Sequence, residues 1–591
     1  MVVKISKPKT KFKWRVVDNH SPKEIYNRAL YLSVFVFGIL GAARGMDEGA
    51  VAGAVYHQSF KDRFGLSDTT KSASWLANRK SNITAMVQLG SVGGSLLASY
   101  LCDRIGRQRS LQFLCVIWIV GAVIQITAKT FGHLVVGRLI EGFAIGQTTT
   151  VGPAYLSEVS PPAYRGLFGC IFSGAVYFGI FLGYFVNWGT ALHLPYGDRQ
   201  WIIPTSMKLI LSGGIMILSF LWTIESPRWL MKVGRDEKAL KNLCRLRNLE
   251  ADHPYIISEM SDIQAVVAQE NAAVAHYSFL AKFRDLLTVS SIRYRFFFIG
   301  CLSQLLGQWS GANAVTIYAP TLFEIIGVEG VDVMKMTAIL GVVKLCGAYF
   351  AAFFLIDFLG RRRSLYIGIV LQGVCLLYYA IFLNVVPVAQ IESGNLSTSQ
   401  FHASKAAIAA LYLSGVGWTM GFNSVQYLLG AEIMPLRIRS FAQSIIMVLH
   451  FANQYGNSKA LPSMMIAMKS YGAFYFFVGV LATSLFWCWF FIPEVSGRSL
   501  ESMEEVFNLP WYLVGRKGPI LCPDLSQVNH IAPQSTHNTI EKPEEIFIDE
   551  VMPAENTSSD EGEDKDNKDN EEKKTKKETK KEPKQEPGKM V

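Results

Sequence analysis

Long apolar segments alternate with short polar loops along most of the chain. Each segment can cross a bilayer as a helix, because about 20 residues are enough. Twelve such spans lie at residues 29–56, 81–101, 110–128, 131–156, 166–190, 203–224, 293–324, 333–358, 364–386, 405–432, 438–466 and 470–492. The pattern predicts an all-α membrane protein with twelve transmembrane helices, numbered below as spans 1 to 12.

A polar stretch at residues 225–292 separates the first six spans from the last six. Its charged residues recur at helical spacing, which predicts short cytoplasmic helices between two six-helix halves. The expected organisation is an N-terminal tail at 1–28, a first half at 29–224, a linker at 225–292, a second half at 293–492, a C-terminal segment at 493–554 and a charged tail at 555–591. We expect the charged tail to be disordered, because it has too few apolar residues to offset its ordering entropy.

Positive charge gathers in two short loops, after spans 2 and 8, at residues 103–109 and 357–363. Such loops lie on the cytoplasmic side of membranes. With twelve spans, both termini are then cytoplasmic as well. The lysine-rich, polar N-terminus also predicts a cytoplasmic tail rather than a cleaved signal peptide. The expected location is the plasma membrane.

The composition excludes several functional classes. Half of the residues are hydrophobic and 18% are charged, against about 25% charged in soluble domains. The net charge of +10 does not indicate nucleic-acid binding, because many basic residues lie in loops beside apolar segments. Nine scattered cysteines without a CxxC motif predict neither a metal site nor a disulfide framework. No P-loop and no nucleophile–base cluster is present, so neither an enzyme nor a cofactor is expected.

Two motifs recur at matching places in the two halves. Asp-x-x-Gly-Arg begins at Asp103 after span 2 and at Asp357 after span 8. Glu-x-x-Pro-x-x-x-Arg begins at Glu158 after span 4 and at Glu432 after span 10. Two parallel repeats of six spans explain this order, and such repeats place a substrate site between them near the membrane midplane.

Span 1 contains an unusual charged stretch, with Arg44, Asp47 and Glu48. A charge at the centre of a membrane helix costs about 2.5–3.5 kcal/mol on insertion scales. Asp47 is therefore a candidate functional residue. The alternative is that Arg44 and Glu48 lie near the outer end of the span and reach the lipid headgroups.

Eight motifs, in order and including those above, carry a resemblance to a known family. They are Gly45-Met-Asp47, Asp103-Arg-Ile-Gly-Arg107, Gly137-Arg138, Tyr155-Leu-Ser-Glu158 with Arg165-Gly166, Glu225-Ser-Pro-Arg-Trp-Leu230, Gln308-Trp-Ser-Gly-Ala-Asn313, Asp357-Phe-Leu-Gly-Arg-Arg362 and Pro493-Glu-Val-Ser-Gly-Arg-Ser-Leu-Glu501. Over roughly residues 30–505, the chain resembles sugar porters of the major facilitator superfamily. The resemblance implies the major facilitator fold, a small-molecule substrate and a transporter that works as a monomer by alternating access.

The resemblance also implies roles for particular residues. Asp47 would carry the coupling proton with Arg138 as its partner, although the pair would be purely structural in a uniporter. Gln308 and Asn313 match the family's substrate-binding motif. Further candidate substrate ligands in spans 1, 5, 7, 10 and 11 are Arg44, Ser173, Gln304, Tyr427, Asn453 and Asn457, and span 11 also offers His450 and Gln454.

Charged residues at the predicted cytoplasmic ends of the spans form a candidate gate. Exposed ion pairs contribute only about 0–1 kcal/mol each, but a network of several pairs can bias a two-state equilibrium. The candidate gating residues are Arg104, Glu158, Arg165, Glu225, Arg228, Arg361, Arg362, Glu432, Arg439 and Glu494.

Departures from the family pattern bear on the substrate. Glucose and xylose porters usually have two adjacent glutamines in span 7, and here Gly307 replaces the first. Ser173, Tyr427 and Arg44 likewise replace a glutamine, a tryptophan and an aromatic residue. Residues 43–49 resemble fungal fructose–proton symporters, which makes fructose or a related hexose the first expectation. The stretches around Glu225 and Leu246 resemble fungal quinate permeases, and Arg44 suits a carboxylate, so a sugar acid is the main alternative. A sugar uniporter and a nutrient sensor are further alternatives.

Overall fold

The computed structural model describes residues 22–161, 165–275, 279–355, 359–392, 397–423, 426, 433–434, 438–494, 506–507, 509–510 and 513–515. The chain divides into two units, Met1–Ile531 and Ala532–Val591, and all of these residues belong to the first. The charged tail, Tyr427 and Glu432 lie outside the described residues. So do the side chains of Arg165 and Arg439.

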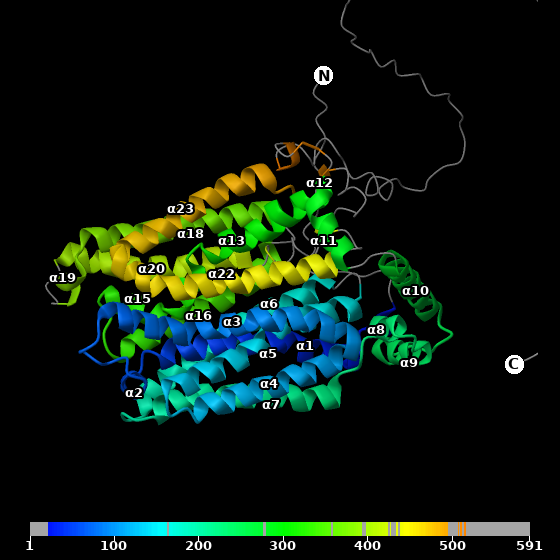
Figure 1. The fold of residues 1–591 in the computed structure, drawn as a ribbon, viewed down its shortest axis with the longest axis horizontal. Helices are drawn as coiled ribbons and strands as arrows, with labels where there is room; N and C mark the ends of the chain where they lie inside the picture. The colour runs from blue at the N-terminus through cyan, green and yellow to red at the C-terminus, as the bar shows by residue number, and fades with distance from the viewer. Residues whose placement is uncertain are drawn as a thin grey trace, which may run out of the picture. The chain divides into compact units, whose positions relative to one another are not determined.

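Helices occupy all twelve predicted spans (Figure 1). In the first half these are α1 (Arg28–Ala54), α3 (Ala73–Ile105), α4 (Arg107–Ile126), α5 (Phe131–Val159), α6 (Arg165–His193) and α7 (Arg199–Trp222). In the second half, spans 8 to 12 are α16 (Val331–Phe350) with the π-helical η4 (Ala351–Leu355), α18 (Arg361–Val385), α20 (Thr398–Trp418) with η5 (Thr419–Asn423), α22 (Arg439–Ala467) and α23 (Lys469–Phe491). Eight of the described helices are long and apolar enough to cross a membrane.

Span 7 is not one continuous helix. It consists of the π-helical η3 (Tyr294–Cys301) followed by α13 (Leu302–Gln308), α14 (Ala312–Ile317) and α15 (Ala319–Ile325). Gly311 lies at the break between α13 and α14 with φ of 87°. Only glycine adopts such a left-handed conformation without strain. The break separates α13 from α14 near the centre of the span.

The polar linker forms the short helices that its pattern predicts. These are α8 (Pro227–Lys232), α9 (Asp236–Arg247), α10 (Pro254–Ala275), α11 (Phe279–Thr288) and α12 (Ser290–Arg293). Trp229, Ala239 and Val267 join α8, α9 and α10 in a small apolar core. The other short helices, η1 (Lys23–Ile25), α2 (Gln58–Arg63) and α19 (Val388–Glu392), lie outside the spans.

Glycines let α1 and α6 approach closely. Gly41, Gly45 and Gly49 recur every fourth residue and face the backbone carbonyls of α6, where a Cβ atom would overlap the carbonyl oxygen. Close backbone packing through small residues is typical of membrane helices. This spacing fixes the side of α1 that turns away from α6.

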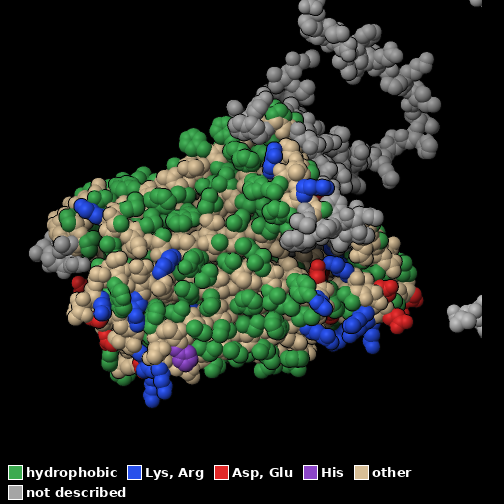
Figure 2. Space-filling view, in the orientation of Figure 1, with side chains coloured by type: hydrophobic (Ala, Val, Ile, Leu, Met, Phe, Trp, Pro, Cys, Tyr) green, Lys and Arg blue, Asp and Glu red, His purple; other side chains and the backbone are tan. Residues whose placement is uncertain are grey.

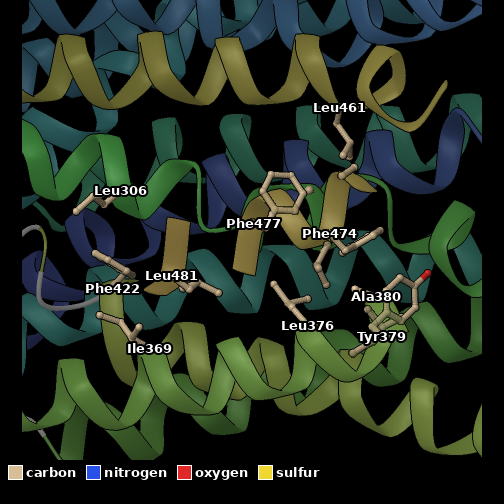
Figure 3. Close-up of a cluster of buried hydrophobic side chains, with 14 of the residues drawn as sticks. Leu306, Ile369, Leu376, Tyr379, Ala380, Phe422, Leu461, Phe474, Phe477 and Leu481 are labelled. Carbon is tan, nitrogen blue, oxygen red and sulfur yellow. The ribbon is translucent and has the colours of Figure 1, made fainter. Parts of the chain in front are cut away.

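The second half has an apolar core of its own, shown in Figure 3. Leu376 and Tyr379 of α18 face Phe474, Phe477 and Leu481 of α23. The rings of Tyr379 and Phe474 pack edge to face with their centroids 4.6 Å apart. The outer surface is also apolar: hydrophobic side chains cover most of the visible face along the helices, and charges lie mainly near the helix ends (Figure 2). This surface suits a multi-pass membrane protein.

The two halves meet through α3 against α22, α6 against α16 and α1 against α14. They touch near both ends of α3. At one end Lys80 donates to Thr321 at 2.9 Å, and Thr84 and Tyr318 share a hydrogen bond of 2.8 Å. At the other end Ser99 bonds to Ser444. Polar side chains at the centre of the interface are therefore enclosed.

Candidate functional site

Asp47 lies in a buried network of four charges. Arg138 Nη1 donates to Asp47 Oδ1 at 2.9 Å, and Lys208 Nζ donates to the same oxygen at 2.5 Å. Lys208 also pairs with Glu141 at 3.0 Å. All four side chains are at most 2% exposed. Two acids and two bases leave this network electrically neutral, which is the arrangement that a low-dielectric interior tolerates.

Neighbouring polar groups complete this network. Glu141 accepts hydrogen bonds from Trp118 at 2.8 Å and from Gln125, both on α4. Arg138 Nε donates to the carbonyl of Ile83 at 2.6 Å. The network therefore links α1, α3, α4, α5 and α7 and joins most of the first half to Asp47.

Sequence reasoning brought Asp47 and Arg138 together but missed Lys208 and Glu141. Both residues are charges inside predicted spans, and that is the signal that could have found them. Lys344, in span 8, was missed in the same way. It is 1% exposed, and its Nζ bonds to Thr316. Within the described part of the chain, Lys344 has no ion-pair partner.

Arg44 forms a second polar cluster between the halves. Its Nε pairs with Glu48 at 3.3 Å. Its Nη2 lies 3.2 Å from both His450 Nε2 and Gln454 Oε1, which belong to α22 of the second half. Arg44 is 9% exposed, and its guanidinium lies over the ring of Phe451. Arg44 is therefore in the interior and does not reach lipid headgroups.

The predicted ligands of span 7 join the same cluster. His450 Nδ1 lies 2.8 Å from Gln304 Oε1 and 3.2 Å from Gln308 Nε2. Asn313 accepts from Gln454 at 3.1 Å and donates to Ser458 at 2.8 Å. Asn457 donates to the Gln308 carbonyl at 2.6 Å. These contacts make a continuous row of amides along α13, α14 and α22.

Two other predicted ligands, Ser173 and Asn453, bond to groups outside this row. Ser173 is half-buried and bonds to the Cys170 carbonyl of its own helix. Asn453 accepts from Trp309 at 3.2 Å. Gly307, the unusual residue of span 7, lies beside the amide of Gln426, because a Cβ there would be 2.8 Å from Gln426 Oε1. The missing glutamine side chain thus makes room for Gln426.

A narrow cavity, with room for about one water molecule, lies beside both clusters. Asp47 of the first cluster and Arg44, Glu48 and Gln454 of the second contribute to its walls. Gln88 and Ser91 of α3 add polar groups. A small polar molecule at this place would contact the charged stretch of α1 and both halves at once.

Several candidate gating residues make contacts within one half. Gly106 has φ of 95°, and Glu225 accepts from the backbone N–H groups of Arg107 at 3.0 Å and Gln108 at 3.2 Å. A side chain at Gly106 would fill the space that Glu225 occupies. Burial raises the pKa of Glu225, and its backbone hydrogen bonds oppose that rise.

The second half repeats this arrangement. Gly360 has φ of 87°, and Glu494 accepts from the backbone N–H groups of Arg361 at 3.0 Å and Arg362 at 3.2 Å. Each glutamate thus lies at a helix N-terminus, where negative charge is favourable. The repeated sequence motifs therefore build the same N-terminal cap for α4 and α18.

The remaining candidate gating residues are placed as follows. Glu158 pairs with Arg107 at 2.7 Å within the first half. Arg104 is exposed and packs on the ring of Tyr100. Arg228 is half-buried in α8. The Glu158–Arg107 pair lies within one half, and the role of these residues as a gate stays a prediction.

Comparison with known proteins identifies the family. Residues 33–507 match the model of a family described as sugar (and other) transporters. The chain belongs to the sugar transporter family. This confirms the predicted resemblance, and it makes the protein a transporter rather than an enzyme.

Members of the sugar transporter family that resemble the chain include a probable quinate permease of Neosartorya fischeri. It is 32% identical over 500 residues, which are 83% of this chain and 90% of the relative. A quinate permease of Neurospora africana is 31% identical over 500 residues, covering 83% and 91%. Neither relative is named for fructose, so the fructose prediction gains no support from them.

Solved structures that resemble the chain confirm the major facilitator fold. The proton:xylose symporter XylE bound to 6-bromo-6-deoxy-D-glucose superposes with a TM-score of 0.67 and 21% identity, covering 82% of this chain and 100% of that chain. A partially occluded inward-open form of XylE from E. coli gives a TM-score of 0.65 with 20% identity, covering 80% and 100%.

We expect the Gln308→Ala variant to raise the apparent KM by about tenfold, since a lost hydrogen bond to a polar substrate is worth about 1.4 kcal/mol. The amide of Gln308 lies in the row that faces His450. Concentration-dependent uptake measures the effect. Gln390→Ala, outside the row on α19, is the matched control, and an unchanged KM for Gln308→Ala would contradict a role as ligand.

Proposed function

We propose that this protein carries a polyhydroxylated carboxylate, such as quinate, across the plasma membrane together with protons. The excess of positive charge at the centre of the molecule carries the proposal. Arg44 and Lys344 are both buried there, and among the described residues the acid that pairs with Arg44 is Glu48, whereas the network around Asp47 is neutral. An anionic substrate would balance the extra charge, which a neutral sugar cannot do.

The row of amides would bind the hydroxyl groups of such a substrate. Hydroxyl groups need donors and acceptors, and each amide of Gln304, Gln308 and Asn313 offers both. Arg44 would bind the carboxylate, because its planar guanidinium matches carboxylate geometry. The names of the fungal relatives agree with this substrate class.

Asp47 is the proposed proton site and Arg138 its partner. When one proton accompanies one monoanion, no net charge crosses the membrane. Only the pH difference then drives uptake, at about 1.4 kcal/mol per pH unit. A neutral sugar with one proton would also gain about 2.3 kcal/mol per 100 mV of membrane potential.

The proposal includes a location in the plasma membrane and a gate at the cytoplasmic side. The protein would act as a monomer with both termini in the cytoplasm, as the positive loops indicate. The helix-terminus contacts of Glu225 and Glu494 would hold each half rigid while the halves rock against each other. Charges on the facing loops would then stabilise the closed inner mouth.

Uptake of labelled quinate and fructose into transporter-deficient yeast tests this function. We expect saturable quinate uptake that an uncoupler abolishes. Replacing Arg44 by Phe should lower quinate uptake at least about tenfold, because the cationic partner of the carboxylate is lost. The uncharged amide of quinate, which gains less from Arg44, should be affected less.

Lys405→Met, on the exposed part of α20, is a matched loss of positive charge outside the site and should leave quinate uptake unchanged. Saturable fructose uptake without quinate uptake would contradict the proposal and return fructose to first place. Equal losses for quinate and its amide in Arg44→Phe would remove Arg44 from the recognition of charge.

A further inference from the structure

Glu48 makes the contacts that a bound carboxylate would make. It lies on α1 one helical turn after Arg44, and its Oε1 accepts from Arg44 Nε at 3.3 Å and from Gln454 Nε2 at 3.1 Å. The side chains of Arg44 and Glu48 are each 11% exposed. Glu48 therefore lies in the interior and joins the first half to α22 of the second.

A second cation acts on the same carboxylate. Lys344 of α16 lies close enough to Glu48 for their charges to attract each other. Tyr184 of α6 also lies within electrostatic range of Glu48. Its hydroxyl donates to the Thr316 carbonyl at 2.5 Å. Glu48 is thus the acid that balances part of the charge of Arg44 and Lys344.

The contact between Glu48 and Arg44 is longer than the best geometry of such a pair. An arginine can bind a carboxylate through two parallel N–H···O bonds of about 2.7–2.9 Å. Glu48 uses one oxygen at 3.3 Å on Nε, and the narrow cavity lies against Arg44 and Glu48. A carboxylate in the cavity would reach the guanidinium at the same place.

We propose that Glu48 and the substrate's carboxylate compete for Arg44, so that Glu48 sets how tightly an acidic substrate binds. The inference rests on the proposed function. An anionic substrate must displace Glu48 or share the site with its negative charge, and like charges that share a site repel. A neutral substrate meets no such repulsion, so Glu48 acts only on the acidic one.

Glu48→Gln tests the competition, because glutamine keeps the shape and the hydrogen bonds while removing the charge. Full-length protein in detergent is titrated calorimetrically with quinate and with its uncharged amide. We expect the Kd for quinate to fall roughly tenfold, the effect of about one charge pair in a partly hydrated site. The Kd for the amide should stay within about twofold.

Two further variants serve as controls for the charge of Glu48. Glu48→Asp keeps the charge on a shorter side chain, so the ratio of the two Kd values should stay near that of the wild type, even if both change. Glu329→Gln removes an exposed acid outside the site and should change neither Kd.

The outcomes separate the two proposals. A selective gain for quinate in Glu48→Gln supports the competition. If quinate binds to the wild type, but Glu48→Gln prefers quinate over its amide no more strongly than the wild type does, the competition is overturned. The proposed function then remains intact. Absence of quinate binding to the wild type and to Glu48→Gln overturns both.

Discussion

Replacing Lys208 by methionine should sharply reduce the amount of folded protein. The change removes the cation that pairs with Glu141 at 3.0 Å and with Asp47 at 2.5 Å. Three charges with a net charge of −1 would remain in the interior. Breaking a buried pair by removing one partner costs about 3–5 kcal/mol, a large part of the stability of a typical protein.

A second substitution should restore stability. In Lys208→Met/Glu141→Gln the remaining charges, Asp47 and Arg138, balance again, and glutamine still accepts from Trp118. Thermal unfolding in detergent, followed by size-exclusion chromatography, measures both variants. We expect the double variant to melt well above the single variant and close to the wild type.

Lys335→Met is the matched control. Lys335 is exposed and pairs with Asp332 at 3.6 Å, and exposed pairs contribute only about 0–1 kcal/mol. A Lys208→Met protein as stable as this control would contradict the network. A double variant that is less stable than Lys208→Met would contradict the charge balance within it.

The fold was predictable because hydropathy determines where a chain crosses the membrane. The spans follow from apolar length and the halves from the repeated loops at Asp103 and Asp357. Span 7 shows the limit of this reasoning. Hydropathy marks residues 293–324 as one segment, but the backbone breaks at Gly311. A break in a membrane helix depends on neighbouring groups that form hydrogen bonds with its backbone. These neighbours cannot be identified from the sequence.

The sequence predicted which residues contribute to the candidate site better than it predicted which of them contact each other. Arg44, Gln308 and Asn313 were recognisable as polar residues inside apolar spans. Their partners His450 and Gln454 lie on α22, far away in the sequence. Lys208 and Glu141 were visible as intramembrane charges, yet only the rotation of α5 and α7 about their axes decides that they meet Asp47.

Removal of the Asp47 carboxylate should abolish accumulation of substrate against a gradient. Asp47→Asn alone would leave the buried network with one extra positive charge, so the loss of transport could reflect misfolding. Asp47→Asn/Lys208→Met avoids this, because Arg138 and Glu141 then balance. In proteoliposomes with an imposed pH difference, the wild type should accumulate quinate about tenfold per pH unit for one coupled proton. The variant should only equilibrate it, while still exchanging labelled for unlabelled quinate.

Lys208→Met/Glu141→Gln is the natural comparison. It loses the same lysine and is also charge-balanced, but it keeps the Asp47–Arg138 pair, in which Oδ1 and Nη1 are 2.9 Å apart. We expect it to keep accumulating quinate. Accumulation by both double variants would place the coupling proton on another acid, with Glu48 of the cavity wall as a candidate. Failure of both to accumulate would mean that Asp47 is not the only member of the network required, since both variants lose Lys208 and the second also loses Glu141. Because the two variants differ only in which acid is removed, a difference between them can come only from Asp47 or Glu141.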